Sequence, residues 1–299
     1  MSNEEIIEEI NKYSESVEDT IYMLKPYLFE GIGYSLPTNS SPEFRKHIDA
    51  AILLYKEKDL EFKNARTVLD SLDLNYYIRD NQTNSIDIIQ DSIVKISSFC
   101  AELLCRFDNY LTNKNIGNHC FLVAMIRLKA TFQSSVILLR NGYYMEVSTV
   151  FRLIYEQLCW SCYAVEQTHI NNIKDKSVTK TIKYIKKIND RYPELYSIFS
   201  REAHIDPKII KDYLREESSG VKVLNRSGKE CREKTIYLIL LIKIYVEIIQ
   251  YSLEKHLILS NDKNKEFQEI INLSLQNIAY INKAFKGDDN IKLKYSNLL

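Results

Sequence analysis

The sequence predicts an all-α protein: a multi-helix bundle built on a central antiparallel helix hairpin, with a smaller helical subdomain at the N-terminus. Only 7 glycines and 5 prolines interrupt the 299 residues, and the tight turns of sheet-rich folds draw on both residue types. Apolar residues make up 45% of the chain and recur at steps of three and four, which is the helical period. Long helices that bury one apolar face against each other therefore fit this chain best.

The N-terminal subdomain is expected over residues 1–80. Its predicted helices cover Asn3–Leu24, Pro42–Lys56 and Lys58–Leu72. Ser41 before Pro42 is a favourable helix start, because a capping hydroxyl precedes a proline at the first helical position. The segment Lys25–Ser41 is rich in Gly, Pro, Ser and Asn and is expected to form a loop, and the polar run Arg79–Ser85 marks the domain boundary.

The main bundle is expected over residues 85–285, followed by a C-terminal tail over residues 286–299. Its predicted helices cover Ile86–Thr112, His119–Arg140, Tyr144–Gln167, Cys231–Leu259 and Asp262–Phe285. Asn141 and Gly142 form a short stop between the second and third of these helices. Two long helices joined by so short a turn must lie antiparallel, which predicts the central hairpin.

Shorter elements are expected between the third and fourth long helices. The predicted helices cover Lys174–Asp190, Pro193–Arg201 and a segment from Asp206–Pro207 to about Arg215. Ser218–Lys229 is expected to form a loop or a small hairpin.

Charge is balanced over the whole chain but uneven along it. Lys plus Arg and Asp plus Glu both number 40, so no whole-molecule field steers the protein to nucleic acid or to an anionic membrane. The first helix is acidic, whereas the segment Lys174–Arg191 is basic. Such a pair of segments suits a homo-oligomer or a protein partner.

The sequence indicates a cytoplasmic protein without a membrane segment. The first ten residues, MSNEEIIEEI, lack the basic and then apolar order of a secretory signal. The most apolar stretch, Ile236–Tyr251, contains Lys243 and Glu247 and is short for a membrane span, so it predicts a buried helix.

We expect neither a metal nor a cofactor. The six cysteines should be free thiols, because no export signal points to an oxidising compartment. Cys159 and Cys162 have CxxC spacing, but they fall inside a helical pattern and no second ligand pair accompanies them. They are expected to be small core residues.

Arg152 and Glu156 are the first candidate site residues. They lie in Phe151–Val165, a segment apolar nearly all round, which is typical of a helix at the centre of a bundle. Because the two are four residues apart, their side chains meet on one face. Buried charges are costly unless they are paired, so the two form either a structural ion pair or part of a polar pocket.

Further candidates lie on neighbouring segments. Ser200 and His204 are also four residues apart; His204 could act as an acid or base, with the Ser200 hydroxyl as its partner, or it could only cap its helix. Arg127 and Lys129 lie on the partner helix of the hairpin and could add positive charge around Glu156, which would suit a phosphate or carboxylate ligand. Alternatively, one of them is a solvated surface residue.

A basic stripe is predicted on the helix Lys174–Asp190. Its members are Lys176, Lys180, Lys183 and Lys187. The stripe could lie along a nucleic-acid backbone, could bind the acidic first helix of a neighbouring molecule, or could be a solvated face.

The segment Arg127–Trp160 resembles a family of bacterial helical proteins known mainly as a domain of unknown function. The shared pattern is a helix with a basic residue, a turn with glycine, and a helix with Arg-x-x-x-Glu, matched here by Lys129, Asn141–Gly142, and Arg152 with Glu156. Ser200 and His204 match the family's later Ser-x-x-x-His motif. The resemblance covers the central third of the chain. It implies a distant relation to HEPN ribonucleases and a role in bacterial defence or toxin systems.

The chain departs from the HEPN nuclease motif, in which an arginine precedes a histidine by four to six residues. None of the five histidines has an arginine at that spacing, and Arg201 is too close to His204. Two functions therefore fit the sequence. One is a non-catalytic helical protein that binds a partner or itself, and the other is a HEPN-like, metal-independent ribonuclease that uses Arg152, Glu156 and His204.

Overall fold

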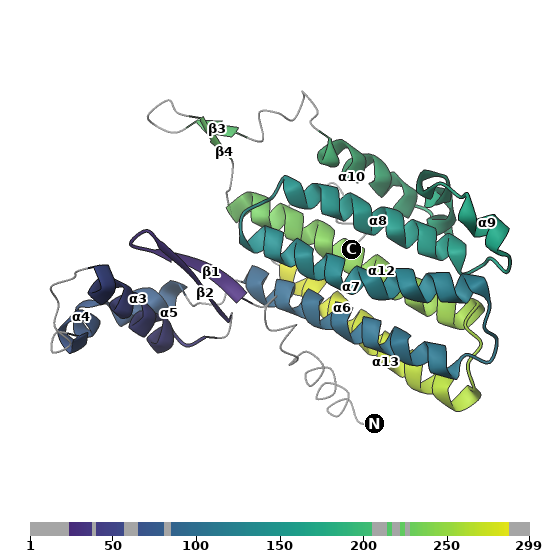
Figure 1. Ribbon diagram of the computed structural model, residues 1–299, viewed down its shortest axis with the longest axis horizontal. Coiled ribbons are helices and arrows are strands. Elements are labelled where there is room, and N and C mark those ends of the chain that lie inside the picture. The colour runs from purple at the N-terminus through teal and green to yellow at the C-terminus, as the bar shows by residue number, and fades with distance from the viewer. Residues whose placement is uncertain are drawn as a thin grey trace.

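The computed structural model describes residues 24–37, 40–56, 65–80, 85–204, 214–216, 222–224 and 228–286. Over these residues the protein is an all-α multi-helix bundle, as predicted (Figure 1). The expected first helix, apart from its last residue, and the expected tail beyond residue 286 lie outside the described residues. Residues 57–64 and the predicted helix start at Asp206–Pro207 lie outside them as well.

Long helices that run side by side form the bundle (Figure 1). They are α6 (Ser85–Tyr110), α7 (Ile116–Arg140), α8 (Glu146–Ala164), α12 (Gly228–Lys255) and α13 (Asn261–Lys286). Each overlaps a predicted helix and differs from it by only a few residues at either end.

The hairpin of α7 and α8 forms through the predicted turn. Gly142 has a φ of 75°, a conformation that glycine adopts without steric cost, and Asn141 N donates to Ile137 O at 3.0 Å. At the other end of α7, the Asn115 side chain accepts from Asn118 N at 2.8 Å. This cap starts the helix at Ile116, a few residues earlier than expected.

The hydrophobic core is centred on α12. Its residues from Leu238 to Ile249 are buried except for Lys243 and Glu247, which confirms the prediction that Ile236–Tyr251 is a buried helix. By length and composition alone, α7 and residues Glu230–Lys255 of α12 could each cross a membrane, a criterion that a buried core helix also meets. On α8, in contrast, Leu153 is 45% exposed, so this helix is less enclosed than its sequence suggests.

A second layer of short elements covers α8. It consists of α9 (Ile170–Lys174), the 3₁₀ helices η2 (Val178–Lys187) and η3 (Tyr192–Glu194), and α10 (Leu195–Ala203). A helix covers most of the predicted range Lys174–Asp190, but it is a 3₁₀ helix and not an α-helix. The small strands β3 (Leu214–Glu216) and β4 (Lys222–Leu224) pair antiparallel, so the predicted helix does not continue to Arg215. This hairpin starts earlier than the predicted segment Ser218–Lys229 and overlaps it through β4.

The N-terminal module begins with a hairpin that the sequence did not predict. Strands β1 (Leu24–Phe29) and β2 (Ile32–Pro37) pair antiparallel, so the expected loop over Lys25–Ser41 is wrong for most of its length. The turn residues Glu30 and Gly31 have φ values of 49° and 78°. Two successive left-handed residues are the signature of a type I′ turn, whose twist matches that of the paired strands.

Short helices complete this module. They are α3 (Pro42–Lys56), α4 (Ala65–Ser71) and α5 (Leu74–Asp80). The predicted cap of α3 is confirmed, since Ser41 Oγ accepts from Phe44 N at 3.1 Å. Helix α5 includes Arg79 and Asp80, so the polar run Arg79–Ser85 begins inside this helix.

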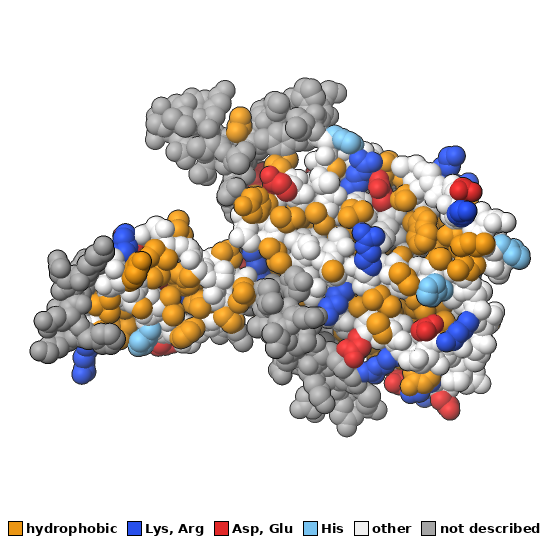
Figure 2. Space-filling model, in the orientation of Figure 1, with side chains coloured by type: hydrophobic (Ala, Val, Ile, Leu, Met, Phe, Trp, Pro, Cys, Tyr) orange, Lys and Arg blue, Asp and Glu red, His pale blue; other side chains and the backbone are white. Residues whose placement is uncertain are grey.

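Much of the visible surface of the module is hydrophobic (Figure 2). Leu28 is 78% exposed and Tyr55 is 77% exposed. Its interior is small and partly polar: buried Arg45 lies 4.7 Å from the ring centroid of Tyr27, and the Tyr34 hydroxyl donates to the buried Asp49 at 2.5 Å. Burial and the Asp49 carboxylate raise the pKa of Tyr34. A core this small contributes limited stability, so the attachment of the module to the bundle is important.

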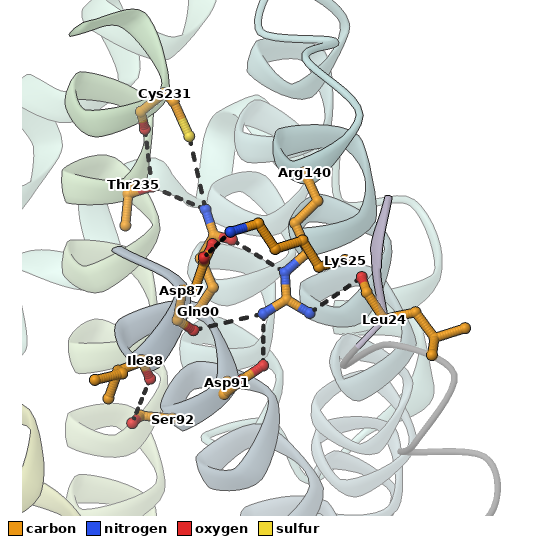
Figure 3. Close-up of polar contacts among 10 residues, drawn as sticks. All are labelled: Leu24, Lys25, Asp87, Ile88, Gln90, Asp91, Ser92, Arg140, Cys231 and Thr235. Carbon is orange, nitrogen blue, oxygen red and sulfur yellow. Dashed lines mark hydrogen bonds and ion pairs between the residues drawn. The ribbon is translucent and has the colours of Figure 1, made fainter. Parts of the chain in front are cut away.

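The attachment is a buried polar cluster around Arg140, the last residue of α7 (Figure 3). The Arg140 side chain is 2% exposed, and its Nη2 pairs with Asp91 Oδ1 of α6 at 2.5 Å. Arg140 Nη1 donates to the carbonyl oxygen of Leu24 in β1 at 3.5 Å. Beside it, Lys25 Nζ pairs with Asp87 Oδ2 at 2.9 Å.

Gln90 extends this cluster into α12. Its Oε1 accepts from Arg140 Nε at 3.2 Å, and its Nε2 donates to Thr235 Oγ1 at 3.2 Å (Figure 3). The cluster thus joins the N-terminal hairpin, α6, α7 and α12 at one end of the bundle.

Candidate functional site

One face of α8 carries polar side chains at successive four-residue steps. Its members are Ser148, Arg152 and Glu156, and the first two bond to residues of α10. The other side of α8 buries Phe151, Ile154 and Leu158 completely. A helix with one polar stripe in an apolar surface positions these groups at the boundary between the bundle and its outer layer.

Arg152 is the centre of the candidate site. Its Nε donates to Glu156 Oε1 at 2.8 Å, and its Nη2 donates to the Tyr196 hydroxyl at 3.3 Å. Its Nη1 lies 2.6 Å from His204 Nε2. The side chains of Arg152 and Glu156 are 24% and 20% exposed, so the pair is half-buried rather than enclosed. The hydrogen bond to Glu156 raises the pKa of Arg152.

His204 accepts a hydrogen bond in this arrangement. A guanidinium can only donate, so His204 Nε2 must present its lone pair to Arg152, which requires a neutral ring with its proton on Nδ1. His204 ends α10 in an extended conformation and is exposed. The lone pair that a general base would use is therefore occupied by Arg152.

A second polar group lies deeper, one turn before Arg152. Lys234 Nζ of α12 pairs with Glu202 Oε2 of α10 at 2.6 Å and donates to Ser148 Oγ at 2.9 Å. Serine beside lysine can be a nucleophile and its base, but Ser148 is fully buried and Lys234 is bound to a carboxylate. We interpret the group as a structural tie between α8, α10 and α12.

The structure brings together some of the predicted site residues and separates others. Arg152, Glu156 and His204 converge, with Arg152 bonded to both of the others. Ser200 is half-buried, and its hydroxyl makes no hydrogen bond to any residue that the structure describes. Lys129 lies near Cys105 of α6, and Arg127 is exposed, so neither basic residue of α7 joins the contacts of Arg152 within the described chain.

Sequence reasoning missed Tyr196, Glu202, Lys234 and Ser148. Two of them left a signal in the sequence. Glu202 lies inside the Ser200–His204 motif, and Lys234 is a charge at the start of the most apolar helix. A charge at such a position needs a partner, but the sequence does not say which carboxylate provides it.

The lysines after α9 are arranged by the 3₁₀ geometry of η2, in which residues three apart share a row. Lys180, Lys183 and Lys186 form one exposed row, while Ile182, Ile185 and Ile188 form the row that packs on the core. None of the three lysines forms an ion pair with a residue that the structure describes. We call Lys176, Lys180, Lys183, Lys186 and Lys187 the basic surface.

The remaining two lysines of the basic surface are bound to the protein. Lys187 Nζ pairs with Glu166 Oε2 at 2.5 Å, just beyond the end of α8, and Glu166 Oε1 also accepts from the Tyr251 hydroxyl at 3.0 Å. Lys176 Nζ lies 5.0 Å from the ring centroid of Tyr163. Near Glu166, burial lowers the pKa of His256, whose Nε2 is 3.9 Å from the carboxylate. These contacts hold η2 against α8 and α12.

The two cysteines with CxxC spacing are core residues. Cys159 and Cys162 are fully buried on α8, and burial raises the pKa of Cys162 to about 12. A thiol with so high a pKa is a poor nucleophile and a poor metal ligand. Within the described ranges, no group of three His, Cys, Asp or Glu residues is placed to hold a metal ion.

Comparison with known proteins adds no relative: no protein-family model, no curated protein and no solved structure matches the chain. The polar face of α8 and the basic surface are therefore the features that bear on function.

Proposed function

We propose that this chain is a non-catalytic helical binding protein whose basic surface binds an acidic segment of a protein partner. Its place in the cytoplasm, within a bacterial defence or toxin-type system, is part of the proposal and rests on the sequence and its resemblance. The observation that carries the proposal is the row of Lys180, Lys183 and Lys186, which is exposed and has no ion-pair partner among the described residues.

An unpaired row of like charges favours a partner of the opposite charge. The three ammonium groups repel each other, and a carboxylate partner removes this repulsion while adding attraction. The row is also pre-ordered, because Ile185 is buried beneath it and Lys187 ties the end of η2 to Glu166. A preformed surface loses little conformational entropy on binding.

A protein partner fits this surface better than a nucleic acid does. Single-stranded nucleic acid binds by stacking its bases on aromatic rings as well as by charge. The ring of Tyr184 is already contacted by Lys183 and Lys187, at 5.5 and 5.4 Å from its centroid. Tyr163 packs against Tyr184 and donates its hydroxyl hydrogen to Asn172 O. Both rings are therefore engaged in contacts within the protein.

The contacts of Arg152 support a structural role for the polar face of α8. Each donor group of Arg152 is hydrogen-bonded within the protein, to Glu156, Tyr196 or His204. The bonds to Tyr196 and His204 join α8 to α10. The charge of Arg152 is balanced by Glu156, which leaves no net positive field to attract an anion.

Charge reversal tests the proposal. The triple variant K180E/K183E/K186E is expected to weaken binding of a fluorescent oligoglutamate peptide by about tenfold or more at low salt, because three attractions become repulsions. Fluorescence anisotropy gives the Kd. The control variant K46E/K114E/K265E has the same net charge as the triple variant and should keep most of the wild-type affinity. Equal binding by both variants, or tighter binding of a single-stranded RNA than of the peptide, contradicts the proposal.

A metal-independent ribonuclease is the second candidate, favoured by the convergence of Arg152, Glu156 and His204. An RNA phosphate would have to replace His204 on Arg152 Nη1, which would free His204 Nε2 to take the proton of the 2′-hydroxyl. In that case purified protein degrades a synthetic RNA, and both His204→Ala and Arg152→Ala reduce the rate by about 100-fold or more. An inactive wild-type protein excludes this candidate.

A further inference from the structure

The chain contains an acidic segment whose charge complements the basic surface. Among residues 1–23 there are seven acidic residues and one basic residue, Lys12. The acidic residues are Glu4, Glu5, Glu8, Glu9, Glu15, Glu18 and Asp19. This segment lies outside the described residues, and its sequence predicts a helix whose apolar face includes Ile6, Ile10 and Val17.

The charge spacings of the two segments agree. In a 3₁₀ helix the rise is about 2.0 Å per residue, so Lys180, Lys183 and Lys186 follow one another at steps of about 6 Å. In an α-helix the rise is about 1.5 Å per residue, so acidic residues four apart, such as Glu4 and Glu8 or Glu15 and Asp19, also follow at about 6 Å. Carboxylates of the predicted helix can therefore meet successive lysines of the row.

As one straight helix, the predicted acidic segment is too short to span the bundle of its own molecule from end to end. The segment is joined to β1, whereas α9, which precedes η2, lies at the other end of the bundle (Figure 1). The 25 residues of α7, which connect these two ends, span about 37 Å. A helix that extends from Leu24 back to Glu4 spans only about 30 Å, even if it points directly at the target.

We propose that the acidic N-terminal segment, residues 4–19, binds the basic surface of a second copy of this chain. This inference rests on the proposed function and names its partner. A two-fold arrangement would make the contact twice and close as a dimer, whereas a head-to-tail arrangement would continue to larger assemblies. In both arrangements association depends on salt, because the contacts are exposed charges.

Light scattering of the full chain tests the association. We expect a mass above the 35.1 kDa of one chain at about 50 mM salt, and a mass of 35.1 kDa at about 500 mM salt. The variant K180E/K183E/K186E and the variant E4K/E8K/E15K/D19K should each be monomeric at low salt. Mixed together, they should associate, since the reversed acidic segment of one copy meets the reversed lysine row of the other. A wild-type monomer at low salt, or a mixture that stays monomeric, overturns the inference.

A peptide experiment separates this inference from the proposed function. A labelled peptide of residues 1–23 should bind the full chain at least about tenfold more tightly than a peptide with the same residues in scrambled order, because only the first places carboxylates at helical steps. Equal affinities for the two peptides overturn the inference but leave the binding of acidic segments intact. If neither these peptides nor oligoglutamate binds, the proposed function fails as well.

Discussion

Replacing Arg140 by alanine is expected to lower the free energy of unfolding by about 3–5 kcal/mol, the cost typical of removing one partner from a buried ion pair. The Arg140 side chain is only 2% exposed, and it lies where the β1–β2 hairpin meets the bundle. Its loss leaves Asp91 without the guanidinium and deprives Gln90 Oε1 and the carbonyl oxygen of Leu24 of a donor. A buried polar group that loses its partner destabilises the folded state by its full desolvation free energy.

Urea unfolding measures this loss, and α7 provides its own control. Arg127 is exposed on the same helix, and its side chain forms no hydrogen bond or ion pair with the described residues, so Arg127→Ala should change stability by less than about 0.5 kcal/mol. Arg140→Lys should fall between the two, because an ammonium can pair with Asp91 but cannot serve Gln90 and Leu24 together. Amide exchange in Leu24–Pro37 should also accelerate in Arg140→Ala. Equal unfolding midpoints for Arg140→Ala and Arg127→Ala would show that the cluster does not hold the hairpin.

The long helices were predictable because each has a strong local signal. The apolar period, the stop at Asn141–Gly142 and the Ser41–Pro42 start act over a few residues, and the structure confirms them. Arg152 and Glu156 belong to the same group, since a spacing of four residues on one helix places their side chains together.

The N-terminal hairpin was not predicted because its signal is weak and ambiguous. Pro26, Pro37 and the glycines of this segment are typical of a loop, and the turn at Glu30–Gly31 lacks the Asn-Gly or Asp-Gly pair that most often marks a two-residue hairpin. The hairpin is stabilised by groups far away in the chain, notably Asp87 and Arg140. No local pattern contains that information.

The 3₁₀ conformation of η2 was missed for a similar reason. Lysines and isoleucines alternate over residues 180–188 in a way that suits steps of three and of four, so the α-helix was the natural prediction. Packing decides between the two: with steps of three, Ile182, Ile185 and Ile188 all turn toward the core. The same choice moves Lys186 into the exposed row and leaves Lys187 beside Glu166.

Side-chain contacts between different helices could not be predicted from the sequence. His204 was identified from its own motif, but its bond to Arg152 depends on how α10 lies on α8. The same holds for Lys234, whose partner Glu202 is distant in sequence. For the candidate site, the sequence therefore identified the residues and the helices that carry them. That His204 lies beside Arg152 follows from tertiary packing.

Gly117→Ala is expected to destabilise the protein by about 2–3 kcal/mol, although alanine favours helix over glycine by about 1 kcal/mol. Gly117 lies in the first turn of α7, against the end of α8. A Cβ at this position would be 2.1 Å from the carbonyl oxygen of Gln167 and 2.5 Å from that of Ala164. Both are backbone atoms, so the clash is relieved only if the end of α8 moves away from α7.

The movement would affect more than local packing, because Glu166 lies between those two carbonyl groups and holds Lys187. Gly117→Ala should therefore lower the urea midpoint and also weaken oligoglutamate binding by the basic surface. Gly33→Ala is the control: its nearest neighbour, Tyr27 O, is 4.0 Å from the added carbon, so neither property should change. A Gly117→Ala variant as stable as the wild type would mean that the two helix ends separate at little cost. Reduced stability with unchanged peptide binding would mean instead that the basic surface is held independently of the α7–α8 contact.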